Sequence, residues 1–123
     1  MEIQNALIKD TSLTTADHGL LSSFLTLDYG GSVQGFGGYQ LYSPNIKQHP
    51  NYAGHWIWRC MEVVGVWKWE DLKGKFIRVK MKDWHRIHAI GNIIEDKWFC
   101  PSEELAIMEN EYSKEREKLY ELE

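Results

Sequence analysis

The feature that most constrains the fold of this chain is a cluster of five glycines in the nine positions from Gly30 to Gly38. Residues 20–29 and 36–42 flank it with alternating apolar side chains, a pattern typical of strands. Glycine in a strand usually marks a bulge or a close approach of the backbone to another group. The cluster therefore predicts a bent hairpin, whose glycines either let the strands pack against large aromatic side chains or admit a ligand.

Glycine-rich loops also bind phosphate groups, because they leave backbone N–H groups free to point at an anion. A Walker loop requires Gly-Lys-Ser/Thr before a helix, and the dinucleotide fingerprint requires a helix after its last glycine. Here the next residues, Tyr39 to Tyr42, are predicted to form a strand. Neither known phosphate loop is present.

The remaining periodicities define the fold class. Apolar residues in 3–13 indicate a strand, and residues 77–82 alternate Ile77, Val79 and Met81 with basic side chains. Residues 86–94 form the expected partner strand. Residues 52–64 are predicted to form a helix, with one apolar face made of Ile57, Cys60, Met61 and Val64. Residues 43–51 before this helix are expected to form a loop, and residues 67–72 after it a short turn or helical piece.

Pro101 and an acidic first turn begin a charged helix whose apolar stripe thins after Tyr112. It is expected to begin on the domain, and then to project or to pair with another chain. We therefore predict an α+β protein with an antiparallel sheet of about five strands, one packed helix and a charged C-terminal helix. Residues 1–101 form the α+β domain and residues 102–123 the helix.

Composition limits the location and the partners. Hydrophobic residues make up 43% of the chain, charged residues 26%, and no apolar run approaches the length of about 20 residues that a membrane span needs. The N-terminus lacks the pattern of a signal peptide, and Cys60 and Cys100 stand outside any paired motif. These features predict a protein of the cytoplasm without membrane contact.

The net charge of −4 is unevenly distributed. Residues 102–123 carry eight glutamates and three basic residues, so the rest of the chain is close to neutral. An acidic tail repels nucleic acid, and overall charge therefore does not support non-specific DNA binding.

Metal binding and catalysis leave no signature in the spacing of residues. None of the five histidines (His18, His49, His55, His85 and His88) forms a short chelate with another ligand, so neither a metal nor a cofactor is expected. No Gly-x-Ser-x-Gly motif occurs, and Cys100 before Pro101 has no visible activating base. A binding protein is favoured, and a small enzyme of unknown class is an alternative.

The chain contains six tryptophans, an unusually high number for its length. They either fill the core and subunit contacts or stack on bases. Trp84 lies next to a basic strand face in the sequence, and aromatic and basic groups together can bind single-stranded nucleic acid. Nucleic-acid binding is therefore a second alternative function. Its candidate residues are Arg78, Lys80, Lys82, Trp84 and Arg86.

Asn92 is a polar residue in an apolar setting, between Gly91 and Ile93. A buried amide needs hydrogen-bond partners, which either a ligand or a neighbouring backbone would supply.

Three stretches resemble a family of small bacteriophage and prophage proteins. They are residues 27–32 (Leu-Asp-Tyr-Gly-Gly-Ser) with 35–39 (Gly-Phe-Gly-Gly-Tyr), residues 69–75 (Trp-Glu-Asp-Leu-Lys-Gly-Lys), and residues 90–92 (Ile-Gly-Asn) with 96–99 (Asp-Lys-Trp-Phe). The family includes the Thoeris anti-defence proteins, which sequester a cyclic ADP-ribose signal of a bacterial immune system without cleaving it. The resemblance covers about residues 1–104 and implies an oligomer with a nucleotide pocket, with the glycine-rich motif and Asn92 as candidates.

The leading hypothesis is thus a non-catalytic phage protein that sequesters a small anionic nucleotide of the host and so inhibits defence. Glycines would allow close backbone approach, aromatic rings would stack, amides would hydrogen-bond, and His55 and Arg59 would add charge. The candidate ligand-binding residues are Tyr29, Gly31, Gln34, Phe36, Gly37, Tyr39, His55, Arg59 and Asn92.

Overall fold

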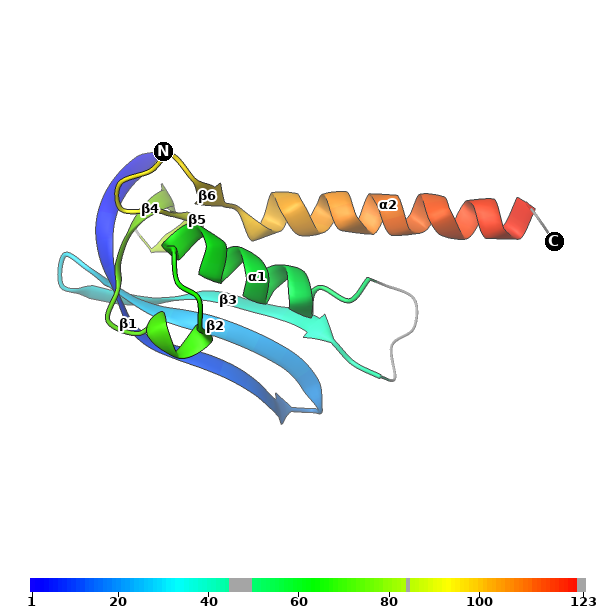
Figure 1. The fold of residues 1–123 in the computed structure, drawn as a ribbon, viewed down its shortest axis with the longest axis horizontal. Coiled ribbons are helices and arrows are strands. Elements are labelled where there is room, and N and C mark those ends of the chain that lie inside the picture. Colours follow the sequence, from blue (N-terminus) through cyan, green and yellow to red (C-terminus); the bar gives the residue numbers. More distant parts are fainter. Residues whose placement is uncertain (45–49, 84, 122–123) are drawn as a thin grey trace.

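The computed structural model describes residues 1–44, 50–83 and 85–121. In this part of the chain six strands form one antiparallel sheet, accompanied by two α-helices (Figure 1). The elements are β1 (Glu2–Asp17), β2 (Leu20–Tyr29), β3 (Ser32–Tyr42), α1 (Ala53–Val64), the short 3₁₀ helix η1 (Trp69–Asp71), β4 (Phe76–Asp83), β5 (Arg86–Gly91), β6 (Trp98–Phe99) and α2 (Pro101–Glu121).

The predicted α+β class is confirmed, and the predicted number of about five strands is one too low. The additional strand is β6, which pairs with β5. Because β6 has only two residues, it is too short to show an alternating pattern in the sequence. The predicted loop over 43–51 lies partly outside the described residues, and His49 and Trp84 lie wholly outside them.

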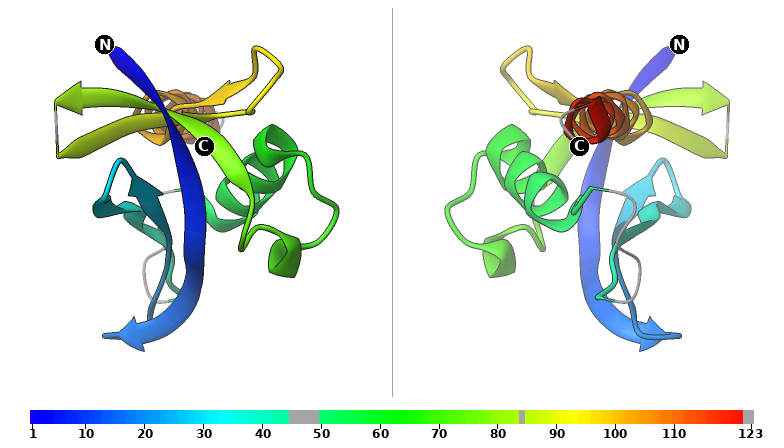
Figure 2. Two further views of the ribbon diagram at one scale, coloured as in Figure 1. Left: turned by 90° about the vertical axis from the view of Figure 1, so that its left-hand side faces the viewer. Right: turned by 90° about the vertical axis from the view of Figure 1, so that its right-hand side faces the viewer.

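The sheet is organised around the long strand β1, and its order is β3-β2-β1-β4-β5-β6. The first part of β1 pairs with β4, and the part from Leu7 onward pairs with β2. A register shift between Ile8 and Asp10 interrupts the pairing near this change of partner. The sheet curls, and α1 packs inside the curl against β3, β5 and β6 (Figure 2).

The glycine cluster forms a tight turn and a bulge. Gly30 and Gly31 join β2 to β3 with φ angles of 58° and 85°, the positive values that a two-residue hairpin turn requires. The β2–β3 register then shifts between the pair Phe24 and Gly37 and the pair Ser22 and Gln40. The prediction of a bulged, bent strand pair is confirmed.

The core is built on the indole of Trp56, which is fully buried. Its ring stacks on Phe36 at 5.4 Å and meets the edge of Phe99 at 5.5 Å. The buried face of α1 consists of Ala53, Trp56, Cys60 and Val63. The predicted face was correct for Cys60 but otherwise displaced by about one residue, because burying the large indole orients the helix.

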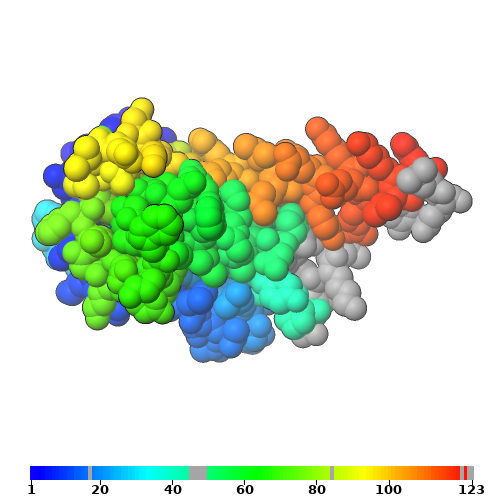
Figure 3. Space-filling view, viewed as in Figure 1, coloured from blue at the N-terminus to red at the C-terminus, as the bar shows by residue number. Residues whose placement is uncertain are grey.

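Helix α2 begins on the domain and then extends away from it (Figures 1 and 3). Leu105 in its second turn is 8% exposed, whereas Leu119 near its end is 64% exposed. In the residues that the structure covers, no helix combines the length and apolar character needed to cross a bilayer.

Candidate functional site

A hollow of about 410 Å³ lies between the C-terminal half of α1 and the loop that precedes β6. Its volume falls within the range of about 300 to 1,000 Å³ that is typical of small-molecule sites. The lining residues are Trp58, Met61, Glu62, Gly65, Val66, Trp67 and Lys97. Trp58 is 69% exposed and Trp67 is 95% exposed, so the hollow is open to solvent and bounded by two accessible indoles.

Asn92 fastens the loop to the end of α1. Its amide Nδ2 donates to the carbonyl oxygen of Val63 at 2.9 Å, and its Oδ1 accepts hydrogen bonds from the backbone N–H groups of Ile94 and Glu95. The side chain therefore satisfies one of the free carbonyl groups at the helix terminus and orders the start of the loop. Of the two alternatives for Asn92, the structure shows the backbone partner.

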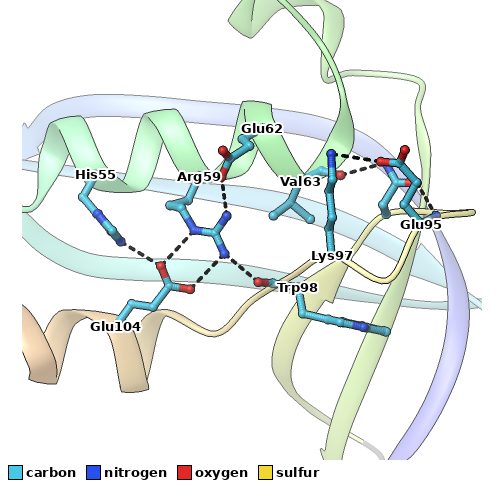
Figure 4. A network of polar contacts seen from close by, with 9 residues as sticks. His55, Arg59, Glu62, Val63, Glu95, Lys97, Trp98 and Glu104 are labelled. Atoms are coloured by element: carbon cyan, nitrogen blue, oxygen red, sulfur yellow. Dashed lines mark hydrogen bonds and ion pairs between the residues drawn. The ribbon is translucent and has the colours of Figure 1, made fainter.

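Arg59 provides the second connection between the two walls (Figure 4). Its Nη2 donates to the carbonyl oxygen of Trp98 at 2.6 Å, and its Nη1 donates to the carboxylate of Glu62. Its Nε donates to Glu104 at 2.9 Å, and this hydrogen bond raises the pKa of the guanidinium. Arg59 thus holds the strand after the loop and orients Glu62 at the edge of the hollow.

The hollow offers apolar contact with a few charges at its edge. Lys97 supplies an ammonium group, whose Nζ lies 3.0 Å from Oε2 of Glu95, and Glu62 supplies a carboxylate. Among the described lining residues none carries a thiol, hydroxyl or imidazole group. This set of side chains can hold a flat ring and one anionic group.

The predicted ligand-binding residues divide between the core, the hairpin and the helix contacts. Tyr29 and Phe36 are buried. The pKa of Tyr39 is raised, mainly because its hydroxyl is partly buried and to a smaller extent because Cys100 lies nearby. Gly31 is exposed in the turn, and Gln34 is half-buried in β3.

Phe36, Tyr39, His55 and Arg59 gather around Trp56 and Phe99, which are themselves fully buried. The structure therefore brings four of the nine together as packing around core aromatics, with His55 Nε2 also 2.8 Å from Oε1 of Glu104. None of the nine lines the hollow.

The predicted nucleic-acid residues are largely engaged within the protein. Arg78 donates to the carbonyl oxygens of Asn92 and Glu95 and lies 4.9 Å from the centre of the Trp98 ring. The ammonium of Lys80 lies 4.1 Å from the same ring centre. Arg86 pairs with Asp83 at 2.8 Å, Lys82 is exposed, and Trp84 lies outside the described residues.

Sequence reasoning did not assign a ligand role to the residues that line the hollow. The sequence marks Trp58 and Trp67 only as members of a tryptophan-rich set, and it gives no signal for Glu62 or Lys97. One signal is present in the sequence: Trp58 flanks the predicted apolar face of the 52–64 helix and does not lie at its centre, so the helix can form with the indole exposed.

This curled six-stranded α+β domain has no match among protein-family models, curated proteins or solved structures.

Proposed function

We propose that this protein is a non-catalytic binding module that holds a small nucleotide in the hollow between α1 and the loop before β6. The observation that carries the proposal is the exposure of two indole rings, Trp58 and Trp67, at a hollow of ligand size. Exposed indoles leave a large apolar area in water, and stacking on a base is worth about 1 to 3 kcal/mol per base.

The chemistry of the hollow matches the parts of a nucleotide. A base would stack on the indoles, and a phosphate group would exchange the contact of Lys97 with Glu95 for its own charge-assisted hydrogen bond. Glu62 would accept hydrogen bonds from ribose hydroxyl groups. Asn92 and Arg59 would act by holding the walls in place.

The resemblance to the phage anti-defence proteins supplies the biological setting of this proposal. In that setting the ligand is a signal of the cyclic ADP-ribose type, and the protein acts in the host cytoplasm as a homo-oligomer. It would inhibit host defence by keeping the signal bound.

The test is calorimetric titration of the full chain with cyclic ADP-ribose, ADP-ribose and AMP. Trp58→Ala and Trp67→Ala should each weaken the binding of cyclic ADP-ribose by roughly 5- to 100-fold, the factor that corresponds to one lost stacking contact. Phe76→Ala removes an aromatic ring of β4 that is 62% exposed, close to the exposure of Trp58, and should leave binding unchanged.

Other outcomes would place the function elsewhere. Binding that survives both tryptophan variants but is lost in Gln34→Ala would assign the ligand to the hairpin and contradict the hollow. Salt-sensitive binding of a single-stranded oligonucleotide that is lost in Lys82→Glu would favour the nucleic-acid alternative. Recovery of a cleaved nucleotide after release would contradict a non-catalytic role.

A further inference from the structure

Three side chains with metal-binding atoms converge where β5 passes the first turn of α2. Nε2 of His88 lies 3.2 Å from Sγ of Cys100 and 3.6 Å from Oε1 of Glu103. All three ligand atoms lie within 4.8 Å of one another. This cluster is separate from the hollow, and it combines the imidazole of His88 in β5, the thiol of Cys100 between β6 and α2, and the carboxylate of Glu103 in α2.

The arrangement differs from that of a nucleophilic dyad. In a catalytic cysteine or serine site, the nucleophile and the orienting carboxylate bind opposite nitrogens of the histidine ring. Here the nearest nitrogen to both the thiol and the carboxylate is the same one, Nε2. Three potential ligand atoms within 4.8 Å of one another are the pattern of a candidate cation site.

The distances agree with the size of a zinc site. Zinc binds sulfur at about 2.3 Å and nitrogen or oxygen at about 2.0 to 2.2 Å, so adjacent corners of its tetrahedron are about 3.3 to 3.6 Å apart. The measured separations of 3.2 and 3.6 Å are close to two edges of that tetrahedron. Sγ of Cys100 also lies 3.9 Å from Nδ1 of His88, so the imidazole has to rotate before its Nε2 lone pair points at a metal bound to the thiolate. A thiolate with an imidazole also favours zinc over magnesium or calcium, which prefer oxygen ligands.

The geometry points to a divalent metal site of the zinc class, formed by His88, Cys100 and Glu103, that clamps β5 to the start of α2. Ser102 supports it, because its Oγ lies 3.4 Å from Sγ of Cys100 and can donate a hydrogen bond to the thiolate. The side chain of His88 is 19% exposed and that of Glu103 is 72% exposed, so the fourth position faces water.

The test uses Co²⁺ and Zn²⁺ with the full chain after treatment with a chelator. We expect one equivalent of Co²⁺ to produce a thiolate-to-metal charge-transfer band, and Zn²⁺ to displace it. Cys100→Ser should abolish the band. His88→Asn and Glu103→Gln should each weaken Zn²⁺ binding by about tenfold or more, since losing even an outer-shell partner costs about 10- to 100-fold.

The controls are a histidine and a glutamate outside the cluster, His85→Asn and Glu109→Gln, which should bind Zn²⁺ as the unaltered chain does. Thermal unfolding of the unaltered chain with Zn²⁺ and with chelator gives a second measurement that needs no variant, and Zn²⁺ should raise the midpoint. Binding of less than one equivalent, a Cys100→Ser chain that binds as tightly, or an unchanged midpoint would overturn the proposal.

Discussion

Gly37 and Trp56 show how one missing side chain determines the core. Gly37 has a φ angle of 122°, a conformation that other residues rarely adopt. A Cβ atom at this position would lie 2.5 Å from the carbonyl oxygen of Ser23 and 2.8 Å from the indole of Trp56. The bulge in β3 and the burial of the indole therefore depend on the same glycine.

Gly37→Ala should consequently destabilise the fold by about 2 kcal/mol or more, through the strained backbone and the two collisions. The measurement is the free energy of unfolding in urea. Gly54→Ala is the matched control, because Gly54 is exposed in α1 and nothing lies within 4 Å of an added Cβ. That control should be neutral or more stable by up to about 1 kcal/mol, since alanine favours a helix. Equal effects of the two changes would contradict this account.

The helices α1 and α2 are connected by Glu104. Its Oε1 lies 2.9 Å from Nε of Arg59 and 2.8 Å from Nε2 of His55, and its Oε2 accepts from Nη2 of Arg59 at 3.2 Å. Burial raises the pKa of Glu104, but the hydrogen bonds from Arg59 and His55 outweigh this effect and the pKa lies below its ordinary value. The carboxylate thus fixes the direction in which α2 leaves the domain.

This lowered pKa predicts a loss of stability in acid. The unfolded chain takes up a proton at Glu104 near the ordinary pKa of 4.5, whereas the folded chain resists protonation until lower pH. The stabilisation from Glu104 is therefore complete when the pH is above the ordinary pKa of 4.5, and it is lost as the pH falls through the lower pKa of the folded chain.

Urea unfolding at about pH 7 and about pH 3.5 measures the effect. Glu104→Gln should be less stable than the unaltered chain at neutral pH and should lose less stability in acid. Glu109→Gln, a glutamate farther along the same helix, should keep the original pH dependence. A Glu104→Gln chain with an unchanged acid response would show that the contacts of Glu104 with Arg59 and His55 do not contribute to the stability of the fold.

On the scale of the whole molecule, the described residues of the distal part of α2 bury little surface. Beyond Met108 the helix is mostly exposed, and half-exposed Tyr112 has Arg116 6.0 Å from its ring centre. The part of α2 after Met108 is short, and an isolated helix of such a length is only marginally stable in water. The distal helix therefore adds little to the stability of a single copy.

A chain that ends at Asn110 should accordingly unfold in urea within about 1 kcal/mol of the full chain. A chain that ends at Cys100 should be clearly less stable, because it loses Glu104 and the buried Leu105. Native mass spectrometry of the full and shortened chains also tests the predicted homo-oligomer. A monomeric full chain would contradict that prediction, and a large loss of stability on ending at Asn110 would contradict the small contribution of the distal helix.

Several parts of this protein could be predicted from sequence because they depend on neighbouring residues. Alternation in 20–29 and 77–82 correctly predicted strands, since successive side chains of a strand point to opposite faces. In 77–82 the apolar residues Ile77, Val79 and Met81 form the buried face. The glycine cluster correctly predicted the turn and the bulge. The charged tail was correctly predicted as a helix.

Other features depend on contacts between distant residues, and only the tertiary structure decided them. The hollow joins Trp58 and Glu62 of α1 to Lys97, and its walls are held by a hydrogen bond between Arg59 and Trp98, 39 positions apart. His88 and Cys100 also meet only because β5 passes the start of α2. Local periodicity specifies which face of an element is apolar, but it contains no information on which other element will cover that face. Therefore the chain's pattern determined its two helices and every strand except β6, whereas the packing of α1 inside the curled sheet determined the sites.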